Sequence, residues 1–123
     1  MTTYLLASAS VHTTAVACDY LAERLTDDDT VMVLGVVEPG TPSRDVSDAI
    51  NVARARLAAA TVWTEQREGD PVEAILDLAA DVDADEIIVG RRSGDPEQME
   101  MGLGGTAAAV AGEAERAVVI VPV

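Results

Sequence analysis

"EGDPVEAILDLAADVDADEIIVG", residues 68–90, contains the local signals that decide the fold. Asp70 precedes Pro71, and Glu73 follows three residues after Asp70, which is the pattern of a capped helix start. Apolar residues then recur at helical spacing, at Val72, Ile75, Leu76 and Ala79. A polar break separates this helix from a short apolar strand at 86–89. One helix followed by one buried strand is the repeating unit of an α/β fold.

The same alternation of strands and helices extends along the whole chain. Strands are expected at 4–8, 30–37, 62–67, 86–89 and 117–121. Helices are expected at 13–25, after a cap at Ser43, after the cap at Asp70, and at 105–115. The strand at 30–37, TVMVLGVV, is almost continuously apolar, which is typical of parallel strands covered on both faces. The pattern predicts one α/β domain over residues 1–123, with a doubly wound parallel sheet and helices on both faces.

The composition supports a packed core without large aromatic side chains. Apolar residues make up 49% of the 123 residues, and Phe is absent. No apolar run is long enough to cross a bilayer, and the first residues lack the basic segment of a signal peptide. Cys18 is the single cysteine, so no internal disulfide can form. We therefore expect a cytoplasmic location and no membrane partner.

The charge of the chain is strongly negative. The sequence has 22 acidic residues, 8 arginines and no lysine, for a formal net charge of −14. Such a surface repels nucleic acid, so no nucleic-acid partner is expected. Adaptation to high salt is the simplest interpretation, because screening makes a heavily acidic surface tolerable. Recognition of an unknown protein partner is the alternative.

A loop with five glycines runs from Gly90 to Gly105 and leads into an alanine-rich helix. The free amides at the start of that helix, at Gly105, Thr106 and Ala107, would point at an anion. Glycines also let the backbone approach a ligand closely. A surface loop that merely precedes a helix is the alternative explanation of the same pattern.

The charged residues of this loop include two arginines, which favour phosphate binding, and three carboxylates, which oppose it. Arg91 and Arg92 can reach phosphates, or they can pair with Asp95 and Glu97. The loop is not a Walker A loop, because that motif needs a lysine. It is not a dinucleotide fingerprint, which should follow the first strand. Three carboxylates oppose a triphosphate unless a cation lies between them.

No group of residues predicts covalent or metal chemistry. His12 is the single histidine and is expected to be exposed, and Cys18 is expected to be buried. The acidic clusters at 27–29 and 81–85 are expected to be solvated rather than to bind a metal. We therefore expect no catalytic residue and no metal site, with a slow ATPase as the enzymatic alternative.

Four segments of the chain resemble the universal stress protein family. They are EGDPVEAIL at 68–76, ADEIIVGRRS at 84–93, LGGTAAAV at 103–110 and AVVIVPV at 117–123. The resemblance covers almost the whole chain and implies a five-stranded parallel sheet with strand order 3-2-1-4-5. It also implies a homodimer formed through the last strand, at 117–123. An exposed apolar edge strand would otherwise invite aggregation.

The resemblance also implies how a nucleotide would bind. Members that bind ATP have a loop whose first glycine matches Gly90 and whose closing pair matches Gly105 and Thr106. In this chain the second glycine, Gly94, comes one place late, and the loop has one extra residue. Ala9 stands where nucleotide binders carry an acid, and Val36 matches a residue that touches adenine.

The candidate binding residues are therefore drawn from three places along the chain. They are Ala9, Val36, Gly90, Arg91, Arg92, Gly94, Gly105, Thr106 and Ala107. These residues predict weak binding of ATP or another adenine nucleotide, with Mg²⁺, to a regulatory or sensor domain. A nucleotide-independent protein-interaction module of the same family is the alternative.

Overall fold

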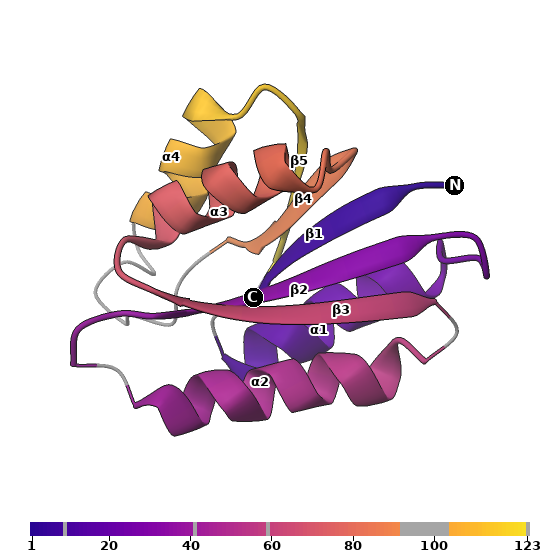
Figure 1. The fold of residues 1–123 in the computed structure, drawn as a ribbon, viewed down its shortest axis with the longest axis horizontal. Helices are drawn as coiled ribbons and strands as arrows, with labels where there is room; N and C mark the ends of the chain where they lie inside the picture. Colours follow the sequence, from indigo (N-terminus) through magenta and orange to yellow (C-terminus); the bar gives the residue numbers. More distant parts are fainter. Residues whose placement is uncertain (9, 41, 59, 92–103, 123) are drawn as a thin grey trace.

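One parallel sheet of five strands, in the order β3-β2-β1-β4-β5, forms the centre of the molecule (Figure 1). The computed structural model describes residues 1–8, 10–40, 42–58, 60–91 and 104–122. The strands are β1 (Thr3–Ser8), β2 (Thr30–Val37), β3 (Thr61–Glu68), β4 (Glu86–Gly90) and β5 (Ala117–Val121). The predicted doubly wound sheet and the strand order implied by the resemblance are confirmed.

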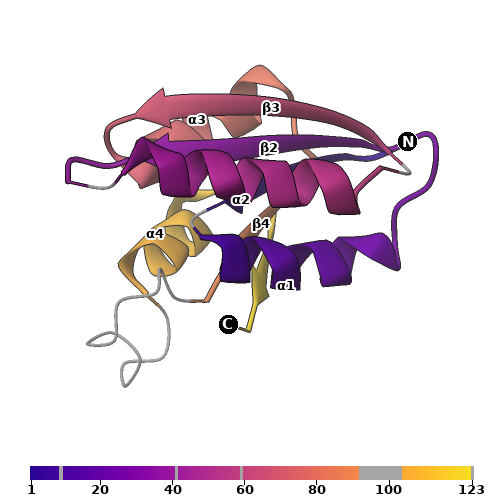
Figure 2. The same ribbon diagram turned by 90° about the horizontal axis from the view of Figure 1, so that it is seen from below.

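Helices cover both faces of the sheet, as Figure 2 shows. They are α1 (Val11–Ala22), α2 (Ser43–Arg56), α3 (Pro71–Asp81) and α4 (Gly105–Glu113). Alternate strand residues enter two separate cores: Leu6 packs with α1 and α2, whereas its neighbour Leu5 packs with α3 and α4. Both faces of the central strands β1, β2 and β4 are therefore largely buried, which explains their nearly continuous apolar sequences. None of these described helices is long and apolar enough to span a membrane.

The starts of α3 and α2 differ in how they are capped. Asp70 accepts a hydrogen bond from the backbone N–H of Val72 at 3.3 Å, and Pro71 occupies the first helical position, which confirms that prediction. The cap predicted at Ser43 is wrong. Pro42 takes the N-cap position without a side-chain hydrogen bond, and Ser43 is already helical.

Helix α1 starts two residues earlier than predicted, at Val11 rather than at residue 13, and ends at Ala22. The Ser10 hydroxyl accepts a hydrogen bond from the backbone N–H of Thr13 at 3.2 Å and so caps the helix. An expectation based on apolar spacing missed this start because its first residues are exposed. The buried face also differs from the expected stripe, and consists of Thr13, Thr14, Ala17, Cys18 and Leu21.

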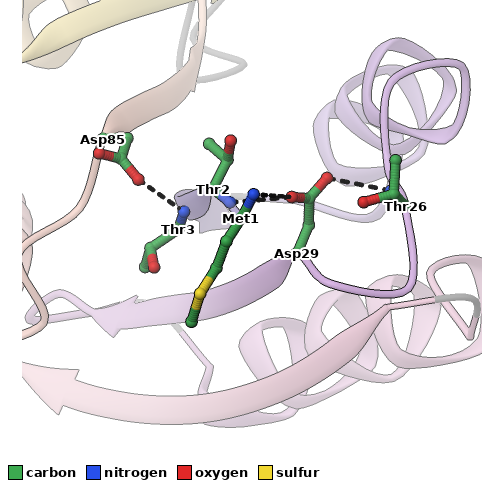
Figure 3. A network of polar contacts seen from close by, with 6 residues as sticks. All are labelled: Met1, Thr2, Thr3, Thr26, Asp29 and Asp85. Carbon is green, nitrogen blue, oxygen red and sulfur yellow. Dashed lines mark hydrogen bonds and ion pairs between the residues drawn. The ribbon is translucent and has the colours of Figure 1, made fainter.

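Two aspartates fasten the beginning of β1 to the rest of the sheet (Figure 3). Asp29 is only 5% exposed, and its carboxylate accepts hydrogen bonds from the backbone N–H groups of Thr2, at 2.9 Å, and Thr26, at 3.0 Å. Asp85 accepts a hydrogen bond from the backbone N–H of Thr3 at 2.8 Å. The expectation that residues 27–29 carry only solvated charge is therefore wrong for Asp29, because its carboxylate completes the main-chain hydrogen bonding of a loop.

We predict that Asp29→Asn lowers the melting temperature at neutral pH by roughly 5 °C. The hydrogen bond from the Thr26 amide, followed by that from Thr2, holds the pKa of the Asp29 carboxyl below its ordinary value. A lowered pKa adds stability above the ordinary carboxyl range, and that stability is lost as the pH falls through the folded-state pKa. The difference between Asp29→Asn and the parent chain should therefore shrink in acid. Thermal unfolding across pH measures this, with Asp28→Asn, at an exposed neighbour, as the control.

Candidate functional site

The strand order reverses between β1 and β4, so the chain leaves these two neighbouring strands toward opposite sides. In open α/β sheets, ligands bind beyond the carboxyl ends of the strands at such a reversal. Here those ends are Ser8 and Gly90. The next helices along the chain are α1 and α4, so their starts and the carboxyl ends of β1 and β4 are the expected location of a ligand site.

Helix α4 begins at Gly105, as predicted, and no side chain of the described residues caps its first main-chain donors. Gly104 is the N-cap residue, and the N–H of Ala108 makes the first helical hydrogen bond, to the Gly104 carbonyl at 3.0 Å. The N–H groups of Gly105, Thr106 and Ala107 therefore have no acceptor within the helix. A Cβ atom built on Gly105 would meet no atom of the described residues within 4 Å, so none of them blocks the approach of an anion to these donors.

Arg91 links the end of β4 to the start of α4. Its N–H donates to the carbonyl of Val121 at 2.8 Å, and its carbonyl accepts from the N–H of Gly104 at 2.7 Å. Its side-chain Nε is buried and has no hydrogen-bond partner among the described residues. A buried donor without a partner costs about 1–3 kcal/mol, which an anion bound beside it would recover.

The remaining described candidates lie at the same edge of the sheet. Val36 is the last residue but one of β2, and it packs against the core on the α3 and α4 side, to which Ala107 also belongs. Gly90 is the last residue of β4 and lies opposite Val121. The other predicted residues, Ala9, Arg92 and Gly94, lie outside the described residues, as do Asp95, Glu97 and Glu100.

A chain of hydroxyl groups at the end of β1 was not predicted from the sequence. The Ser8 hydroxyl lies 2.6 Å from that of Thr14, which donates to the Ser10 carbonyl at 2.7 Å. The Ser10 hydroxyl donates to that of Thr13 at 3.1 Å. The spacing of these residues in SASVHTT is the only sequence signal. Because the hydroxyls satisfy one another, they join β1 to α1 and present no charge to a ligand.

The described residues do not bring together a nucleophile and a base. His12 is exposed on the first turn of α1. Cys18 is 1% exposed, and burial raises the pKa of its thiol to about 11, which keeps the thiol protonated and unreactive at neutral pH. Within the described ranges, no group of three His, Cys, Asp or Glu side chains is placed to hold a metal ion.

Fold and site together define a class. It is a doubly wound α/β protein with a buried arginine donor and with a helix start that no described side chain caps, both near the reversal of strand order. The family model described as "Universal stress protein family" matches residues 42–122. The chain belongs to the universal stress protein family. No significant match was found among curated proteins.

Solved structures with the same fold include proteins described with bound nucleotides. Hypothetical protein MJ0577 has a TM-score of 0.84 at 17% identity, with 99% of this chain and 96% of that chain covered. A universal stress protein in complex with cAMP has a TM-score of 0.70 at 22% identity, with 98% and 96% covered. A universal stress protein family protein from Arabidopsis thaliana, with AMP bound, has a TM-score of 0.68 at 19% identity, with 99% and 91% covered.

Proposed function

We propose that this chain is a regulatory or sensor domain that binds an adenine nucleotide weakly at the carboxyl edge of its sheet. The observation that carries the proposal is the start of α4, whose first amides no described side chain caps, joined to Arg91 by the hydrogen bond from the Gly104 N–H to the Arg91 carbonyl. The Arg91 Nε is buried and has no partner among the described residues. In this arrangement the phosphate accepts hydrogen bonds from the first amides of α4 and from Arg91. The base lies toward Val36. Structural relatives described with cAMP and AMP support the proposal.

A monophosphate fits this edge better than free ATP. Each further phosphate charge must approach a chain with a net charge of −14, so ATP would need Mg²⁺ to accompany it. Position 9, which is an acid in nucleotide-binding members, is alanine here, so a charged hydrogen bond worth about 1.5–3 kcal/mol is missing. We therefore expect binding to be weak and to strengthen when salt screens the acidic surface.

Titration calorimetry with AMP and with adenosine, in molar KCl, tests the proposal. We predict that AMP binds with a dissociation constant between about 0.1 and 1 mM, and that adenosine binds at least about tenfold more weakly. The difference arises because adenosine lacks the phosphate that the α4 amides and Arg91 would hold. Equal binding of both ligands would contradict the proposed phosphate site.

A nucleotide-independent interaction module of the same family is the second candidate function. The hydroxyl chain of Ser8, Ser10, Thr13 and Thr14 favours it, because these groups are already satisfied within the protein and offer a nucleoside little. If the folded protein binds neither AMP nor Mg-ATP in these titrations, this second candidate function is favoured. In either case we expect a cytoplasmic, non-catalytic protein.

We also propose that the chain forms a homodimer by pairing the outer edges of two β5 strands. The N–H of Arg91 bonds to the carbonyl of Val121, so by alternation the main-chain groups of Val118 and Ile120 point away from β4. We predict that Ile120→Pro, which removes an outward N–H, raises the dissociation constant of this dimer at least about tenfold. Sedimentation velocity measures the change, and Ile120→Val, which keeps the N–H, should leave the dimer intact.

A further inference from the structure

The two outer strands of the sheet are β3 and β5. Strand β3 is longer than β5 and more polar. It has eight residues, whereas β5 has five. The N–H of Thr61 donates to the main-chain carbonyl of Asp29 at 3.2 Å, and the N–H of Gly69 donates to that of Val37 at 3.1 Å. The odd-numbered residues of β3 therefore direct their main-chain groups to β2. By alternation, the following residues direct theirs outward: Val62, Thr64, Gln66 and Glu68. Such a row of outward groups is a template for another strand.

Helix α2 leaves this edge accessible. A groove of about 260 Å³ lies between α2 and β3. Across it, Gln66 donates to the Ser47 hydroxyl and Arg54 donates to the Thr64 hydroxyl, both at 2.9 Å. These long polar side chains span a gap that apolar packing would otherwise close. These contacts place α2 over one face of β3, whereas a further strand would pair in the plane of the sheet, at the outer main-chain edge.

We propose that β3 pairs in an antiparallel register with β3 of a second copy of this chain, centred on Gln66 of both copies. Within each copy the Arg67 guanidinium already contacts the carboxylates of Glu65 and, at 3.4 Å, Asp81. In this register Glu65 also faces the partner's Arg67, and Arg67 faces the partner's Glu65, so the two ion pairs would join across the interface. The odd numbers of Glu65 and Arg67 place them at non-hydrogen-bonded positions, where facing side chains lie closest. Opposite charges directly across such a pair stabilise it.

The neighbouring registers are less favourable. Centring the pair on Glu65 would place two glutamates against each other, and centring it on Arg67 would do the same with two arginines. Centring it on Thr64 would place Trp63 against the partner's Glu65 and leave no opposite charges facing each other. Charge complementarity therefore selects a second copy in one register.

Trp63 supports the same register. Trp63 is the only tryptophan in the chain, and it is 60% exposed in spite of its large apolar surface. In the register centred on Gln66 it lies opposite the partner's Gly69, the residue directly after β3, where a built Cβ would meet no described atom within 4 Å. The indole ring therefore has room to lie over this glycine of the partner. The pairing would therefore cover the largest exposed aromatic side chain of the protein.

Charge reversal tests the pairing by sedimentation velocity in molar KCl, where the net charge of −14 on each copy is screened. Glu65→Arg and Arg67→Glu should each raise the dissociation constant for self-association through β3 at least about tenfold. Each variant places like charges across the pair. An equimolar mixture of the two variants should restore association, because each substituted side chain then faces an opposite charge. Failure of the mixture to associate more strongly than either variant alone would overturn the proposal.

Two further variants separate this pairing from other effects. Glu68→Arg changes the charge of the edge by the same amount but faces the partner's Thr64, so it should weaken association less than Glu65→Arg does. Ile120→Pro, which prevents pairing through β5, should leave self-association through β3 unchanged. Complete loss of self-association in Ile120→Pro would show that β5 alone pairs, and would overturn the β3 pairing without affecting the proposed nucleotide site.

Discussion

Gly35→Ala should lower the free energy of unfolding by about 2–3 kcal/mol, because side chains of α2 pack directly against β2 at this glycine. A Cβ atom on Gly35 would overlap Cγ1 of Val46 and come within 3.0 Å of Cδ1 of Ile50. Both side chains are buried, and the β-branched Val46 cannot turn away without leaving its favoured rotamer. The helix itself would have to shift from the sheet. Urea unfolding measures the loss.

Gly112→Ala is the matched control for this prediction. Gly112 lies in α4, and a Cβ built there would meet no atom of the described ranges within 4 Å. The same substitution should therefore raise the free energy of unfolding, by about 0.5–1 kcal/mol, because alanine favours the helix. Equal effects of the two substitutions would show that the close approach of α2 to β2 is not what requires glycine at position 35.

Gly105→Asp should weaken AMP binding at least about tenfold while leaving the fold intact. The new carboxylate would lie at the first position of α4, where the proposed phosphate binds, and like charges repel strongly at such short range. No described atom lies within 4 Å of a Cβ built on Gly105, so the described residues leave room for the side chain. An acid at a helix start also interacts favourably with the helix dipole, so the melting temperature should stay constant or rise. Calorimetric titration with AMP measures the loss of affinity.

Gly112→Asp makes the same chemical change near the other end of α4, away from the proposed phosphate, and should leave AMP affinity almost unchanged. A loss of affinity in both variants would indicate a general effect of added negative charge. Unchanged binding in Gly105→Asp would remove α4 from the site.

Local signals in the sequence predicted most of the fold. The Asp70–Pro71 start of α3, the apolar strands and the start of α4 at Gly105 all follow from short-range chemistry: capping, alternation and glycine at a helix boundary. The candidate residues Val36, Gly90, Arg91 and Gly105 also lie at one edge, because parallel strands end on the same side of a sheet.

Features that depend on contacts between distant segments could not be predicted. Asp29 seemed to belong to a solvated acidic run, and only folding brings its carboxylate to the N–H of Thr2. The Ser10 cap is a local contact, but the hydrogen bond between the hydroxyls of Ser8 and Thr14 forms only because the end of β1 lies against α1 in the fold. Apolar spacing carries no information about such polar contacts.

The most direct test of the account is an NMR titration that follows the backbone amides of the ¹⁵N-labelled protein as AMP is added in molar KCl. The account predicts that the amides of Gly105, Thr106 and Ala107 shift most, together with the Nε–H of Arg91, and that adenosine moves these signals much less. Shifts that are absent, or that cluster away from the start of α4, would contradict the proposed nucleotide site.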